Sequence, residues 1–160
     1  MTLVLIRVDD RLIHGQVAVG WSRSYNVNRI IVANDSVAKD ETQKMLLKMA
    51  CPVGVEASIL TIKEATTQIL QNKFRKEKVM MLVKDPGSLI KLIEGGIDIK
   101  EVNVGNVSIK EGRKKIVKEI AATPEEVKEW KKLDELNLKL RVQWLPGSSS
   151  KNFNNIIRKE

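Results

Sequence analysis

Leu3-Val4-Leu5-Ile6-Arg7-Val8-Asp9-Asp10-Arg11-Leu12-Ile13-His14-Gly15-Gln16 is the stretch that decides the fold. Its first four residues are all apolar, a pattern typical of a strand buried on both faces of a parallel sheet. A charged segment follows, and residues 16–25 then read as a short helix. A buried strand that leads into a helix is the building unit of parallel sheets, so this stretch indicates an α/β fold.

The rest of the chain repeats the alternation of strand and helix. Further strands are predicted at residues 29–33, 53–60, 78–83, 101–104, 115–121 and 138–144, and further helices at 39–50, 62–72, 89–94 and 124–136. We therefore expect a three-layer α/β fold: a mainly parallel, twisted sheet of about six or seven strands, with helices on both faces and an antiparallel edge strand. The sequence predicts a single domain over residues 1–160, with a loosely structured tail after about residue 146.

Some local features are also predicted. Ser88 is the expected N-cap of the helix at residues 89–94. Trp21, Met45 and Met49 have the spacing of core residues on helices. Cys51 is expected to be a small buried hydrophobic residue at a helix end.

Composition and charge narrow the classes of function. The chain is 42% hydrophobic and 30% charged, with a formal net charge of +8. A basic surface permits binding to nucleic acid, anionic lipid or an acidic protein. Because the lysines are scattered and aromatic residues make up only 4%, a dedicated nucleic-acid surface is not expected. No apolar stretch is long enough for a membrane span, and the lone Cys51 excludes an internal disulfide, which fits a reducing cytoplasm.

His14 is the only histidine, so any chemistry that needs an imidazole has one possible position. A metal site is not expected, because no second His or Cys is available and the adjacent Asp9 and Asp10 cannot both point inward from a strand. Ser22 and Ser24 lack the elbow motif of a hydrolase nucleophile. No Walker-type loop or dinucleotide fingerprint is present, so no ATP or NAD cofactor is expected. A buried structural histidine and a phosphoryl carrier remain as readings.

The neighbours of His14 favour the phosphoryl carrier. Ligands of open α/β sheets gather at the carboxyl ends of the strands, and His14 follows the first strand. It is expected at a helix N-terminus, where the backbone amides of Gly15 and Gln16 and the helix dipole favour an anion. Gly15 also removes a side chain at the point of approach.

Two arginines and two aspartates lie beside His14 in the sequence. Arg7 and Arg11 supply planar donors that suit a phosphate group. Arg11 is the first candidate for stabilising a phosphoryl group, whereas Arg7 fits a structural ion pair equally well. Asp9 or Asp10 is expected to orient His14 or Arg11 through a hydrogen bond, or to shape the turn.

Residues 7–17 resemble the active-site loop of the enzyme IIB component of the mannose-type sugar phosphotransferase system. The resemblance continues in residues 28–35, 100–105, 110–113 and 123–126, and so spans the chain from Met1 to about Pro146. It implies that His14 carries the phosphoryl group on the ring nitrogen nearer the backbone, and that the other ring nitrogen is hydrogen-bonded to the protein.

The resemblance also implies partners and a reaction. A phosphohistidine of the IIA protein donates the phosphoryl group, and a hexose that arrives through the membrane components IIC and IID accepts it, usually at its 6-hydroxyl. The protein would then be a protein-N(π)-phosphohistidine–sugar phosphotransferase in the cytoplasm, held peripherally at the membrane. In this scheme Arg11 stabilises the phosphoryl group and Asp10 orients the site, without metal or cofactor. The alternative is a non-catalytic regulatory or protein-binding module on the same fold.

Overall fold

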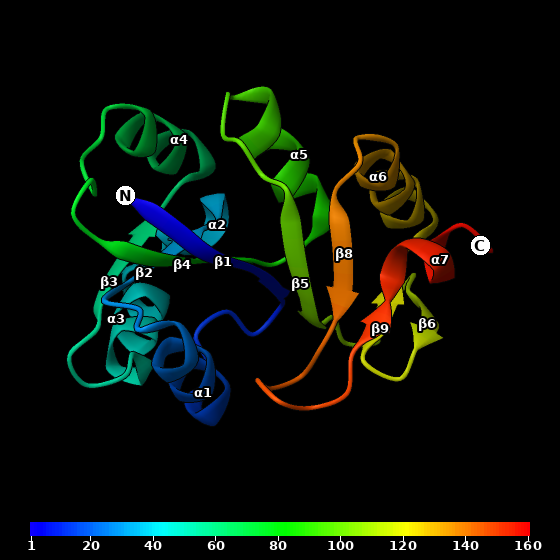
Figure 1. Ribbon diagram of the computed structural model, residues 1–160, viewed down its shortest axis with the longest axis horizontal. Helices are drawn as coiled ribbons and strands as arrows, with labels where there is room; N and C mark the ends of the chain where they lie inside the picture. The colour runs from blue at the N-terminus through cyan, green and yellow to red at the C-terminus, as the bar shows by residue number, and fades with distance from the viewer.

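The computed structural model describes all 160 residues and contains one large sheet with helices on both faces (Figure 1). The strands are β1 (Thr2–Asp9), β2 (Arg29–Ala33), β3 (Glu56–Leu60), β4 (Lys78–Val83), β5 (Glu101–Asn106), β6 (Lys114–Val117), β7 (Ile120–Ala122), β8 (Lys139–Val142) and β9 (Lys151–Asn152). The helices are α1 (Gly15–Tyr25), α2 (Asp35–Ala38), α3 (Glu41–Ala50), α4 (Ile62–Leu70), α5 (Pro86–Glu94), α6 (Pro124–Glu135) and α7 (Phe153–Ile157).

Seven strands form the large sheet in the order β3-β2-β4-β1-β5-β8-β9. Neighbouring strands are parallel except at the edge, where β9 pairs antiparallel with β8. The predicted α/β fold, with its mainly parallel sheet and antiparallel edge strand, is confirmed. Because β1 lies in the middle of the sheet, its carboxyl end opens between β4 and β5, where an open sheet presents its ligands.

Each face of the sheet has its own hydrophobic core. The larger core lies under α4, α5, α6 and α7 and includes Ile6 and Val8 of β1. The smaller core lies under α1 and is built from Trp21 and residues of β2 and β4 such as Ile30 and Met80. Figure 1 shows α4, α5 and α6 on the side of the sheet opposite α1 and α3. Trp21 is therefore in the core, as predicted.

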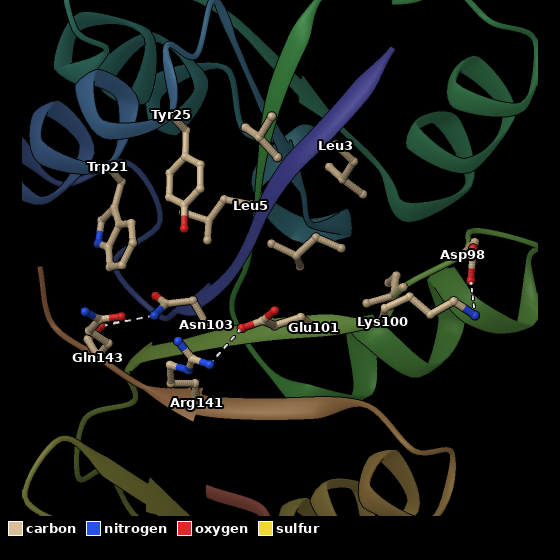
Figure 2. Close-up of a pocket in the computed structure, with 13 residues that line it drawn as sticks. Leu3, Leu5, Trp21, Tyr25, Asp98, Lys100, Glu101, Asn103, Arg141 and Gln143 are labelled. Carbon is tan, nitrogen blue, oxygen red and sulfur yellow. Dashed lines mark hydrogen bonds and ion pairs between the residues drawn. The ribbon is translucent and has the colours of Figure 1, made fainter. Parts of the chain in front are cut away.

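The smaller layer of helices leaves part of the sheet uncovered. A groove of about 310 Å³ opens between α1 and strands β5 and β8. Figure 2 shows Trp21 and Tyr25 reaching from α1 toward Asn103 of β5 and Gln143, just after β8. The groove therefore ends beside the residues that support the carboxyl end of β1.

Two predicted segments differ from the structure. The predicted strand at residues 115–121 is a hairpin of β6 and β7, which pair antiparallel outside the large sheet. Its partial alternation did not reveal the turn. The tail after residue 146 is not loose: it forms β9 and α7, because Phe153 and Ile157 lie one helical turn apart and bury completely. Phe153 packs edge-on against Trp130 of α6, with ring centroids 5.1 Å apart.

Three local predictions were wrong. Helix α5 begins earlier than expected, because Asp85, not Ser88, is the N-cap and Pro86 occupies the first turn. Met45 and Met49 are 56% and 75% exposed, since no residue of α3 is buried. Helical spacing alone did not show that α3 rests on the sheet only through half-buried residues.

Candidate active site

Strand β1 carries Arg7 and Asp9 to the carboxyl edge of the sheet on the same face, because residues two apart in a strand share a face. The Asp9 carboxylate is fully buried and binds two guanidinium groups. Arg7 donates from Nη2 at 3.2 Å, and Arg11 donates from Nε at 2.9 Å and from Nη2 at 2.8 Å. Two cations therefore share one anion, and this cluster of three residues carries a net positive charge.

Arg11 is the more accessible of the two arginines, with a quarter of its side chain exposed. Its hydrogen bonds with Asp9 raise its pKa, so it is fully charged at neutral pH. The third guanidinium nitrogen, Nη1, makes no hydrogen bond within the protein. The two-bond contact with Asp9 thus fixes one edge of Arg11 and leaves a charged donor free.

Arg7 has a different environment. It is 1% exposed, and it donates to the Asn103 side chain and, at 2.9 Å, to the carbonyl oxygen of Gln143. Burial lowers the pKa of Arg7 to about 10, and its Nε is buried without a partner. Of the two predicted roles of Arg7, this position supports the structural ion pair. A fully buried guanidinium group does not reach a ligand at the surface.

His14 is the N-cap of α1 and is exposed. Its carbonyl oxygen accepts the amides of Val17 and Ala18, both at 3.1 Å. Neither ring nitrogen has a hydrogen-bond partner in the protein. The expected hydrogen bond from a ring nitrogen of His14 to Asp9 or Asp10, and the bond implied for the second ring nitrogen, are therefore not present. The amides of Gly15 and Gln16 are also unpaired. An exposed imidazole therefore lies beside two free donors at a helix N-terminus.

Gly15 is required by its backbone conformation. A Cβ at this position would meet no protein atom within 4 Å, so packing within the protein does not require glycine. Its φ of +31° does, because a side chain is strained in that region. Gly15 sets the turn by which the chain leaves the site loop and enters α1.

Asp10 does not orient His14 or Arg11 by a hydrogen bond, contrary to expectation. Its carboxylate accepts the amide of Ser108 at 2.9 Å and the Asn106 side chain at 3.1 Å. Lys110 and Arg113 lie 3.7 and 3.6 Å from it. Asp10 is the next residue after Asp9 and so points to the other face, where it anchors the loop after β5.

The sequence did not predict the supporting residues of the site that are distant in the chain but adjacent in space. Asn103 and Gln143 hold Arg7, and Trp144 lies against Arg11, with the guanidinium carbon 4.6 Å from the ring centroid. Gly105 lets β5 approach Arg7, because a Cβ there would lie 2.5 Å from Nε and closer still to Cζ. A buried polar Asn and a Gly within an apolar strand were the available signals.

A second concavity lies at the same edge of the sheet but on the α5 and α6 side. Its volume is about 610 Å³, and Asp35, Asp85, Arg113, Glu126 and Glu129 are among its lining residues. Burial, followed by the charges of Asp85 and Glu126, raises the pKa of Glu129. Neither His14 nor Arg11 lines it. No cluster of three or more His, Cys, Asp or Glu side chains is placed to hold a metal ion.

Comparison with known proteins shows that the chain is similar to IIB components of the sugar phosphotransferase system. Residues 3–160 match the family described as the sorbose subfamily IIB component of the PTS system. The chain is 34% identical over 158 residues to the fructose-specific EIIB component of Bacillus subtilis, covering 99% of this chain and 97% of the relative. It is 36% identical over 143 residues to the mannose-specific EIIAB component of Escherichia coli, covering 89% of this chain and 44% of that longer protein.

Solved structures of IIB proteins have the same fold as this chain. The IIB domain of the sorbose permease from Klebsiella pneumoniae superposes with a TM-score of 0.94 at 31% identity, covering 99% of this chain and 98% of that chain. The N-acetylgalactosamine-specific IIB component 1 of Escherichia coli gives a TM-score of 0.86 at 29% identity over 94% of this chain and 98% of that one. No helix in the present structure has the length and apolar character required to cross a membrane.

Proposed function

Because this chain belongs to the sorbose subfamily of IIB components of the sugar phosphotransferase system, we propose that His14 is the residue on which it carries the phosphoryl group. The family acts as a phosphocarrier and sugar phosphotransferase in sugar uptake. The observation that carries the proposal is the position of the only imidazole: exposed, unpaired, and at the N-terminus of α1.

The proposed reaction begins with neutral His14. A neutral imidazole has a ring nitrogen with a free lone pair, which makes it the nucleophilic form of the side chain. One ring nitrogen attacks the phosphorus of a phosphohistidine on the IIA protein. The bond between that phosphorus and the donor nitrogen breaks as the new bond to His14 forms. The donor histidine leaves with the electron pair of the broken bond.

Phosphoryl transfer needs positioning and charge stabilisation more than bond-making groups from the protein. Arg11 offers its free Nη1 and a charge secured by Asp9. The unpaired amides of Gly15 and Gln16 add donors for the equatorial oxygens. Arg7 contributes indirectly to the charge of the site. Because Arg7 and Arg11 share the single negative charge of Asp9, that carboxylate does not fully neutralise Arg11. Asp10 holds the neighbouring loop in place.

The acceptor in the second half of the reaction is a hexose, at its 6-hydroxyl, delivered by the membrane components IIC and IID. The IIA protein is the donor, which the combined EIIAB relative supports, because that protein joins both activities by name. The relatives are named for fructose, sorbose, mannose and N-acetylgalactosamine. We place the protein in the cytoplasm, held at the membrane by IIC and IID.

Phosphotransfer from a defined donor tests the proposal. The purified protein is incubated with phosphoenolpyruvate, enzyme I, HPr and the IIA protein, and an acid-labile phosphoprotein is expected for the wild type and not for His14→Gln. Label on the variant would refute the assignment. A second assay separates the carrier from a non-catalytic binding module: membranes that lack only this protein should regain sugar phosphorylation with the wild type and remain inactive with His14→Gln.

A further inference from the structure

The segment after β8 lies directly against Arg11. Trp144 turns its ring toward the guanidinium group, whose central carbon is 4.6 Å from the ring centroid, within the range of a cation–π contact. Asp9 already occupies the Nε and Nη2 edge of the same group. Arg11 is thus held on one edge by a carboxylate and lies over an indole ring, while Nη1 stays free.

The backbone that carries Trp144 is fixed on both sides of the ring. The carbonyl oxygen of Gln143 accepts Arg7 Nη1 at 2.9 Å and the Asn103 amide at 3.3 Å. The carbonyl oxygen of Trp144 accepts the indole N–H of Trp21 at 3.1 Å. Figure 2 shows Trp21, Asn103 and Gln143 converging at one end of the groove. The ring is therefore presented by a rigid support, although it is 38% exposed.

The two contacts restrain different motions of Arg11. Two parallel hydrogen bonds to Asp9 fix an edge of the guanidinium but still let the plane hinge about that edge. An indole ring in contact with the guanidinium group restricts that hinging. The ring quadrupole attracts the cation without neutralising it, so the free Nη1 keeps its full charge as a donor. Preorganised donors are worth more in a transition state than donors that must be ordered during the reaction.

We propose that Trp144 is a positioning residue for phosphoryl transfer, acting through Arg11. The inference rests on the proposed roles of His14 and Arg11. Removal of the ring should reduce the rate of phosphoryl acceptance by about fivefold, the factor that corresponds to a cation–π contact of about 1 kcal/mol. The concentration of IIA protein at half-maximal rate should not change, because Trp144 acts on the reacting group and not on docking.

Single-turnover transfer from phosphorylated IIA protein tests this, with Trp144→Ala, Trp144→Phe and the control Leu145→Ala, which removes the neighbouring apolar side chain packed against the smaller core. Trp144→Ala should lose about fivefold in maximal rate, while Trp144→Phe stays within about twofold, since phenylalanine retains an aromatic face. Leu145→Ala should transfer at the wild-type rate. Urea denaturation of each variant shows that the folded state is retained.

A double-mutant cycle separates positioning from a structural role. In the Arg11→Gln background the Trp144→Ala change should have no further effect on transfer, because the group on which it acts is gone. Equal rates for wild type and Trp144→Ala, or a full fivefold loss that persists without Arg11, would overturn the inference while leaving His14 as the carrier. If the wild type accepts no phosphoryl group, the proposed function itself fails.

Discussion

Gly105→Ala should be among the most destabilising single changes in this protein, although its backbone conformation suits any residue. A new Cβ would lie 2.5 Å from Arg7 Nε and nearer still to Cζ, where ordinary contacts begin at 3.4 Å. Arg7 has to move by about an ångström, and it is fully buried. Its bonds to Asp9, Asn103 and the Gln143 carbonyl cannot all survive that movement.

The magnitude follows from those bonds. A hydrogen bond to a charged group contributes about 1.5–3 kcal/mol, so loss of two of the three costs about 3–6 kcal/mol. That is a large part of the 5–15 kcal/mol that stabilises a typical domain. In an Arg7→Leu background, Gly105→Ala should instead raise the free energy of unfolding. Leucine ends before the guanidinium position, and alanine in a strand is favoured over glycine by about 0.5–1 kcal/mol.

Urea denaturation of the wild type, the two single variants and the double variant measures the coupling between the two positions. We expect a coupling free energy of about 4–7 kcal/mol, because a cost in the wild type becomes a small gain without Arg7. Additive effects of the two changes would refute the argument that Gly105 exists to accommodate the buried Arg7. A small effect of Gly105→Ala in the wild type, within about 1 kcal/mol, would refute it as well.

Further substitutions test other parts of the structure. Arg11→Lys keeps the charge but loses the two-bond contact with Asp9; single-turnover transfer should slow about tenfold or more, and an unchanged rate would remove Arg11 from the mechanism. Glu129→Gln should raise the free energy of unfolding at pH 7, because the raised pKa of Glu129 means that folding disfavours its charged form. That gain should vanish toward acid pH, where the carboxyl is protonated in both states; a gain that is constant in a pH series would contradict the assignment. Phe153→Ala should cost about 3–5 kcal/mol in thermal or urea unfolding, since the ring is fully buried against Trp130, whereas a loose tail would give no change.

Local sequence patterns were sufficient to predict most of the fold and the position of His14. The apolar runs at residues 29–33 and 78–83 predict β2 and β4 residue for residue, because central parallel strands are buried on both faces. The cap and proline at the start of α6 predict that helix equally well. Met45 and Met49 show the limit, since periodicity indicates a face but not whether another element covers it.

The site was predictable only where neighbours in sequence are neighbours in space. His14, Arg11 and the free amides lie within six residues of one another. Asp9, and not Asp10, binds Arg11 because the two side chains take opposite faces of β1, which the sequence of one loop does not show. Asn103, Gly105 and Trp144 reach the site from β5 and from the end of β8 only because β5 lies beside β1 and β8 lies beside β5. Such contacts arise from the order of strands in the sheet.

The central claim is that this protein carries its phosphoryl group on His14. Because the chain has a single histidine, one nitrogen-15 NMR spectrum of uniformly labelled protein, recorded before and after incubation with the phosphorylated IIA protein, reads that side chain without ambiguity. We predict that phosphorylation shifts the imidazole signals, at the ring nitrogen nearer the backbone, in step with incorporation of one phosphoryl group per chain. Incorporation without any change in the His14 signals would contradict the account.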